Sequence, residues 1–104
     1  MSGVRLLPGA LPGSSHQVAS ALRAEGLTPS RWGNGAGFRY AEHDHPYDKV
    51  LVCVEGGIVF HTAGGDVALG PGDRLELASG TRHSATVGDA GVVCVEAPRP
   101  RGPM

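Results

Sequence analysis

The sequence predicts an all-β protein, and three observations carry this prediction. Glycine and proline are abundant, with 17 and 8 copies among 104 residues, which suits many strands joined by tight turns. The apolar residues fall in short runs bounded by glycine-rich segments. Helical periodicity is confined to one segment near the N-terminus. A chain of this length forms one domain around a single core.

The N-terminal region divides into an arm and a helix. Residues 1–13 are rich in glycine and proline, and we expect them to form a flexible arm. Ser14 and Ser15 are good N-caps, and apolar residues then recur at helical spacing. This pattern predicts a helix over 15–25, which Gly26 ends. The helix would cover an edge of the sheet that is otherwise open to pairing.

The rest of the domain, which we expect to span 14–97, is predicted as extended segments separated by turns. Leu75 and Leu77 alternate with Arg74 and Glu76, which is typical of a strand with one buried face. The final residues, 98–104, are rich in proline and are predicted to be disordered. The expected extended segments are 28–32, 38–42, 50–54, 58–62, 66–69, 74–78, 83–87 and 92–97.

The composition argues against several classes of binding partner and indicates a cellular location. The net charge of −1 and the pI near 6.5 argue against a nucleic-acid or membrane-surface partner. No stretch approaches the ~20 apolar residues of a membrane span. The first residues lack the apolar region of a signal peptide, so we expect a cytoplasmic protein. Cys53 and Cys94 lie in apolar runs and are expected to be buried, reduced thiols.

Three histidines carry the strongest functional signal. His43 and His45 are two residues apart on an extended segment, so both imidazoles point to the same face. His83 follows the turn at residues 70–73 and adds a third imidazole. Such a set suits a divalent Zn, Fe, Ni, Cu or Mn ion. The alternative is a protein that keeps these histidines without binding a metal.

The spacing of these residues resembles the two motifs of the cupins. The first cupin motif, G-x5-H-x-H-x(3,4)-E-x6-G, is matched from Gly37 to Gly56, except that Lys49 replaces the acid. The second, G-x5-P-x-G-x2-H-x3-N, is matched at Gly72, Gly80 and His83, whereas Ala78 and Val87 replace the proline and the asparagine. The resemblance covers residues 30 to 97 and implies a small antiparallel barrel of the jelly-roll type.

Lys49 is the departure that bears on chemistry, because the motif acid of cupins completes the set of metal ligands. Asp48 is one possible fourth ligand, although a shift by one residue turns a strand side chain to the opposite face. Alternatively, Lys49 points into the cavity and attracts a substrate carboxylate or enolate. In the third alternative Lys49 extends to solvent and leaves a neutral three-histidine site. Some cupin oxygenases lack the motif acid and use three histidines alone.

Two further side chains are candidates for the site. Arg39 has the strand parity of His43 and can hold an anion bidentately if it lines the same cavity. The alternative, which is the more common one for such an arginine, is a surface or dimer-contact residue. Tyr47 lies two residues after His45 and is a candidate proton donor, or a packing residue after Pro46. Together with Lys49, these are the candidate catalytic residues.

Two functions remain open on the sequence alone. The first is a metal-dependent enzyme acting on a small anionic molecule, with oxygenase chemistry favoured over isomerase or lyase chemistry. The second is a small-molecule- or metal-binding module without turnover, which a cavity lined by Leu51, Cys53, Leu75 and Leu77 would suit. Small cupins usually pair, so a homodimer is expected.

Overall fold

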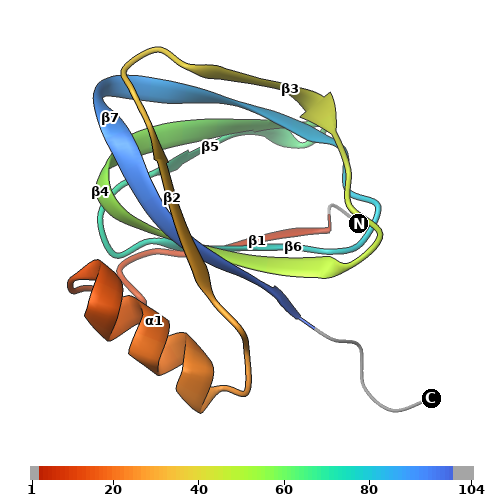
Figure 1. Ribbon diagram of the computed structural model, residues 1–104. Helices are drawn as coiled ribbons and strands as arrows, with labels where there is room; N and C mark the ends of the chain where they lie inside the picture. The colour runs from red at the N-terminus through yellow and green to blue at the C-terminus, as the bar shows by residue number, and fades with distance from the viewer. Residues whose placement is uncertain (1–2, 100–104) are drawn as a thin grey trace.

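The computed structural model describes residues 3–99 and confirms an all-β fold with one helix. The elements in chain order are β1 (Val4–Leu7), α1 (Ser15–Ala24), β2 (Ser30–Asn34), β3 (Arg39–His43), β4 (Asp48–Thr62), β5 (Gly65–Leu69), β6 (Arg74–Leu77) and β7 (His83–Arg99) (Figure 1). Ser14 caps the helix, since its hydroxyl accepts a hydrogen bond from Gln17 N while the Gln17 side chain bonds back to Ser14 N.

Two long strands organise the sheet. The strand order is β1-β6-β4-β7-β2, with β3 pairing to β7 and β5 pairing to β4, and every pairing is antiparallel. β4 and β7 pair along most of their length, and each therefore belongs to both halves of the barrel (Figure 1). The sequence predicted each of these strands as two separate segments, because glycines interrupt both apolar runs.

Those glycines bend the strands without ending them. Lys49, Leu51 and Cys53 face the interior in the first half of β4, whereas Ile58 and Phe60 do so in the second half. This change from odd to even positions requires a shift in the ladder, and β4 is irregular between Cys53 and Ile58.

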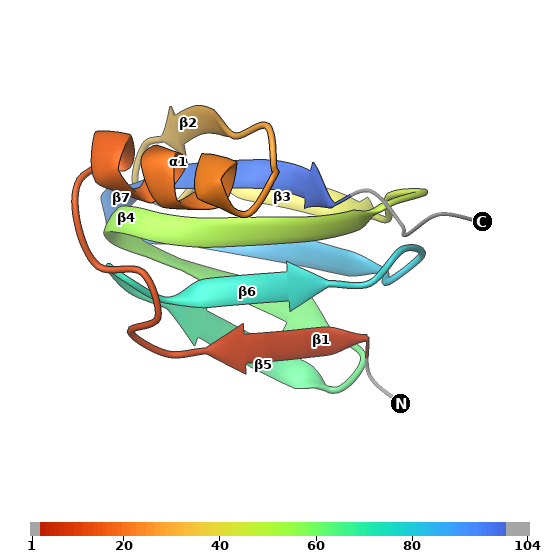
Figure 2. The same ribbon diagram turned by 90° about the horizontal axis from the view of Figure 1, so that it is seen from below.

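Buried apolar residues form two layers. The interior of the barrel holds one cluster, which includes Leu51, Ile58, Leu75 and both cysteines. The second cluster lies between α1 and the outer face of β4 and β7, where Val18 and Leu22 of the helix pack (Figure 2). Cys53 and Cys94 are fully buried, free and opposite each other in the ladder, as expected of reduced thiols.

The predicted domain boundaries need correction at both ends. Residues 4–7 of the expected arm form β1, which pairs with β6 because Leu6 and Leu7 lie opposite Leu75 and Arg74. The helix covers 15–24 and ends within one residue of the prediction. Pro98 and Arg99 still belong to β7, and the remainder of the predicted tail lies outside the described residues. No helix within residues 3–99 is long and apolar enough to cross a membrane.

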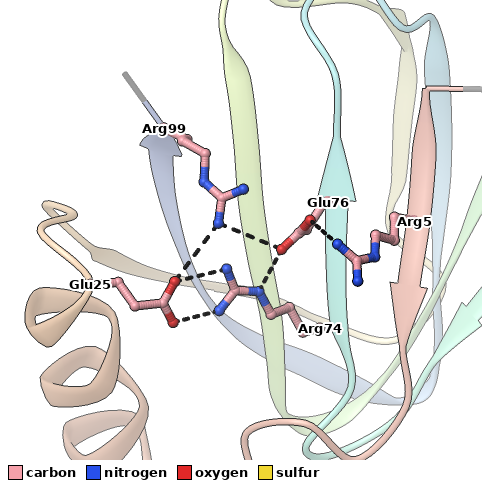
Figure 3. Close-up of polar contacts among 5 residues, drawn as sticks. All are labelled: Arg5, Glu25, Arg74, Glu76 and Arg99. Carbon is pink, nitrogen blue, oxygen red and sulfur yellow. Dashed lines mark hydrogen bonds and ion pairs between the residues drawn. The ribbon is translucent and has the colours of Figure 1, made fainter. Parts of the chain in front are cut away.

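A network of charged side chains ties the end of the helix to the sheet (Figure 3). The buried Arg74 guanidinium donates to both carboxylate oxygens of Glu25, at 2.6 and 2.9 Å, and to Glu76 at 3.0 Å. Arg99 contacts both glutamates, and Arg5 contacts Glu76. The hydrogen bond from Arg74 lowers the pKa of Glu25.

We expect Arg74→Met to destabilise the protein by about 2 kcal/mol. The substitution removes the buried guanidinium that joins Glu25 to Glu76 and leaves the two carboxylates with only the more exposed Arg99 and Arg5. Because Glu25 is partly exposed, the cost is smaller than that of breaking a fully buried ion pair. Arg82→Met is the matched control, because its pair with Glu42 is exposed at both ends. Urea titrations of both variants test this; equal midpoints would show that the Arg74 network contributes no stability.

Candidate metal centre

The fold brings the three predicted histidines together from two segments distant in sequence. His43 ends β3 and is the direct ladder partner of His83, the first residue of β7. His45 follows in the loop, and its carbonyl accepts a hydrogen bond from Gly80 N at 2.8 Å. One ring nitrogen from each of the three lies within 4.8 Å of those of the other two. Because metal–nitrogen distances are about 2.0–2.1 Å, a small inward movement would place all three on one ion.

Two of the imidazoles are oriented by the backbone. His43 Nδ1 lies 2.6 Å from Ala41 O, and His83 Nδ1 lies 2.9 Å from Thr81 O. A carbonyl can only accept, so each Nδ1 must carry the proton and donate it. This leaves each Nε2 unprotonated, as a metal ligand must be. In metal-bound histidines the ring nitrogen that does not bind the metal usually donates a hydrogen bond in this way.

The surroundings favour neutral imidazoles. Burial lowers the pKa of His45, and the positive charge of Lys49 lowers it further. Burial also lowers the pKa of His83, although the hydrogen bond to Thr81 acts in the opposite direction. A depressed pKa keeps the ligand nitrogen free of protons, and proton competition with a metal is therefore weak near neutral pH.

A cavity of about 340 Å³ opens beside the histidines. His43 and His83 form part of its wall, together with apolar and aromatic side chains from β2, β3 and β4. Leu51 contributes to it as expected, but Cys53, Leu75 and Leu77 do not. More polar side chains line the cavity than the sequence predicted. The full lining is Trp32, Asn34, Tyr40, His43, Lys49, Leu51, Ile58, Phe60, His83, Ala85 and Glu96.

Lys49 points into this cavity. Its side chain is 10% exposed, and Nζ lies 3.1 Å from Glu96 Oε1. The interpretation in which Lys49 extends to solvent is therefore wrong. The ammonium is also not a free positive charge, because Glu96 neutralises it from β7. A carboxylate is thus present in the cavity, but it comes from a strand other than the one the cupin motif uses.

Asp48 and Tyr47 take other positions. Asp48 Oδ1 accepts a hydrogen bond from Ser79 N at 2.8 Å, and the residue lines a separate hollow with Arg5 and Glu76. The structure therefore does not place Asp48 as a fourth ligand, because adjacent residues of a strand face opposite sides. Tyr47 is 37% exposed and packs its ring 5.1 Å from that of His45, at the rim and not in the cavity wall.

Of the two alternatives for Arg39, the structure shows the surface position, and the residue does not line the cavity of His43. Arg39 is exposed and lies in a hollow on the outer face, with His61 and Thr86. A bulge between Tyr40 and His43 is the reason, since three steps along β3 match two along β7. The extra residue reverses the alternation, so that Tyr40 faces the cavity in place of Arg39.

Four hydrogen-bonding residues of the cavity were not predicted from the sequence, namely Trp32, Asn34, Tyr40 and Glu96. Trp32 Nε1 donates to Glu96 Oε1 at 2.6 Å, and Asn34 Nδ2 donates to the hydroxyl of Tyr40. Burial raises the pKa of Tyr40, which keeps the phenol protonated. Glu96 had a detectable signal, because it follows Cys94 at inward-facing parity within an apolar run. Tyr40 had none, because a bulge is invisible to strand alternation.

We expect the metal-free protein to lose stability as the pH falls below 6.5, the ordinary pKa of histidine. The folded pKa values of His45 and His83 are lowered, so the unfolded chain binds more protons and acid favours unfolding. The loss starts near the unfolded pKa and continues through the lower folded values. Urea midpoints measured across this range in chelator test the prediction. His45→Gln/His83→Gln should flatten the dependence, whereas His16→Gln, on the exposed face of α1, should preserve it.

Comparison with solved structures places this architecture among known folds. A cupin-2 domain protein from Shewanella frigidimarina NCIMB 400 is similar with a TM-score of 0.60 and 16% identity, over 70% of this chain and 71% of that one. An RmlC-like cupin from the same organism has a TM-score of 0.63 and 21% identity, over 72% and 67%. This chain has the cupin fold. Neither a protein-family model nor a curated protein sequence matches it.

A third similar structure carries a named activity. It is the DMSP lyase DddQ from Ruegeria pomeroyi DSS-3, with a TM-score of 0.66 and 25% identity, over 75% of this chain and 40% of that one. The cupin fold confirms the jelly-roll barrel implied by the two motifs. It does not by itself specify a reaction, because one fold hosts many functions.

Proposed function

We propose that this cupin binds one divalent metal ion through His43, His45 and His83 and acts as a metal-dependent enzyme on a small molecule. The observation that carries the proposal is the convergence of three ring nitrogens within 4.8 Å at the wall of a cavity. Supporting it, two of the rings are held by backbone carbonyls in the tautomer that leaves Nε2 free.

The chemistry proposed is of the oxygenase type, with isomerase or lyase chemistry as the alternative. A bound ion of this kind polarises a carbonyl or activates dioxygen. The protein supplies the orientation: apolar walls at Leu51, Ile58 and Phe60 exclude water, and the ammonium of Lys49, although paired with Glu96, has further N–H donors for an oxyanion. Tyr40 adds a protonated hydroxyl to the same cavity. The lyase activity named for one structural neighbour keeps elimination chemistry among the reactions to be tested.

A binding module without turnover is the second function to be tested. It is favoured by the pairing of Lys49 with Glu96, which ties up the two charged side chains that line the cavity beside the histidines. A binding module would bind the metal or the ligand as the enzyme does, but would catalyse no reaction.

Elemental analysis of the purified protein, followed by assays of the metal-replete form, tests the proposal. We expect about one divalent ion per chain, lost with chelator. We also expect oxygen uptake, or product formation, with members of a panel of small acids, diketones and DMSP. Protein that remains metal-free after incubation with Fe, Ni, Zn, Mn and Cu salts would contradict the metal site. Metal binding without any turnover would favour the binding module.

The assembly and location predicted from the sequence stay predictions. We propose a homodimer, and light scattering of the purified protein tests it, with a monomer mass as the contradicting result. Phe38, which is 46% exposed beside Tyr40, is consistent with a covered surface. The cytoplasmic location stays a prediction, to be tested by cell fractionation.

A further inference from the structure

The wall of the cavity formed by β7 and β2 contains a carboxylate that the metal site does not use. Glu96 is paired in the ladder with Leu51 of β4 and Ser30 of β2, and its side chain is 24% exposed. Oε1 accepts the indole N–H of Trp32 at 2.6 Å and pairs with Lys49 Nζ at 3.1 Å. These two partners fix the position of the carboxylate.

The second oxygen of this carboxylate is available to a ligand. Among residues 3–99, no side chain or backbone group donates a hydrogen bond to Glu96 Oε2, and the residue lines the cavity. A partly buried carboxylate oxygen without a donor favours a ligand that brings one. The strongest such donors are cationic, since bonds between ions are about twice as strong as neutral ones.

The other side chains of the cavity favour the same chemistry. Trp32 and Tyr40 meet edge to face, with ring centroids 5.5 Å apart, and both line the cavity. The face of an aromatic ring attracts a cation, because the ring quadrupole places negative charge there. At the same time, Lys49 pairs with Glu96 and lines the same cavity as His43 and His83, so it places a positive charge beside the carboxylate. The cavity thus contains one positive group, Lys49, and one negative group, Glu96, and the two charges cancel.

We propose that the ligand is a small zwitterion, an amino carboxylate whose ammonium group can donate a hydrogen bond to Glu96. Its cationic group lies at Glu96, Trp32 and Tyr40, and its carboxylate lies toward Lys49 and the histidines. This inference rests on the proposed function and specifies the chemical class of its small-molecule substrate. A simple monoacid of the same length satisfies only the Lys49 side of the cavity, and a diacid meets the carboxylate of Glu96.

Trp32 provides the readout, because it is the only tryptophan of the chain and lines the cavity. The probes are ω-amino acids of two to five carbons, each compared with the acid of equal length without the amine. We expect the better amino acids to bind wild type at least about tenfold more tightly than the matched acids, by fluorescence titration. Glu96→Gln, which keeps an acceptor for Trp32, should abolish that preference, whereas Glu55→Gln on exposed β4 surface should retain it.

Two results would overturn the proposal. One is an acid that binds as tightly as its amino counterpart, or a preference that survives Glu96→Gln. The other is the absence of binding by every amino acid of the series. The titrations are run on metal-free and zinc-loaded protein in parallel. Failure to bind zinc would count against the proposed function alone, because the preference set by Glu96 is still measurable without the ion.

Discussion

The substitution His83→Gln should lower the affinity for Zn²⁺ by at least about 100-fold. His83 is one of the three proposed ligands, and its side chain is almost fully buried. Mutating a residue that hydrogen-bonds to a metal ligand already lowers metal affinity by about 10- to 100-fold, and removing the ligand itself should lower it further. Competition titration against a chromogenic chelator measures the change.

His61→Gln is the matched control for this experiment. His61 lies on the adjacent strand β4 and bonds to Asp66 and Thr86 on the outer face, away from the cavity. Zinc affinity should be unchanged in this variant. If both substitutions weaken zinc to the same extent, the ion binds at the surface and the three-histidine centre is not its site.

The substitution Gly56→Ala should destabilise the protein by at least about 3 kcal/mol. Gly56 has φ of +72°, a conformation that costs other residues about 1–3 kcal/mol. In addition, a Cβ at this position would lie 1.9 Å from the carbonyl oxygen of Gly91, so the backbone of β7 would have to move. The contact lies where β4 and β7 change parity, and a shift there would disturb both halves of the barrel.

Gly35→Ala tests whether the effect is specific. A Cβ added at Gly35 would meet no described atom within 4 Å, and the residue has no positive φ. Its substitution should therefore change stability by less than about 0.5 kcal/mol. Urea unfolding of both variants gives the comparison. Equal stabilities would mean that the close approach of β4 and β7 is not required for the fold.

The sequence was most informative where chemistry depends on fixed spacing. His43, His45 and His83 could be selected because two histidines on one extended segment share a face, and the motif spacing supplied the third. The helix was predictable because Ser14 and Gly26 mark its ends. Lys49 could be recognised as a departure from the cupin pattern, but not placed, because its position depends on Glu96 from the opposite strand.

Two of the errors share a physical cause, which is irregularity in the strands. Alternation assumes an unbroken ladder, so the bulge before His43 moved Arg39 outward and Tyr40 inward. Likewise, the glycines at 56 and 91 were interpreted as strand ends because glycine is common in turns, whereas here they allow two strands to bend and approach closely. β1 was missed because a short edge strand is held by its pairing partner and not by its own composition.

X-ray absorption spectroscopy of the zinc-loaded protein tests the metal centre most directly. We expect a first shell of nitrogen and oxygen atoms at about 2.0–2.1 Å, with the outer-shell scattering of three imidazoles. In His83→Gln reconstituted at high zinc, the same signal should fall to that of two. A wild-type spectrum with one imidazole or none, or a spectrum that does not change in His83→Gln, would contradict a centre built from His43, His45 and His83.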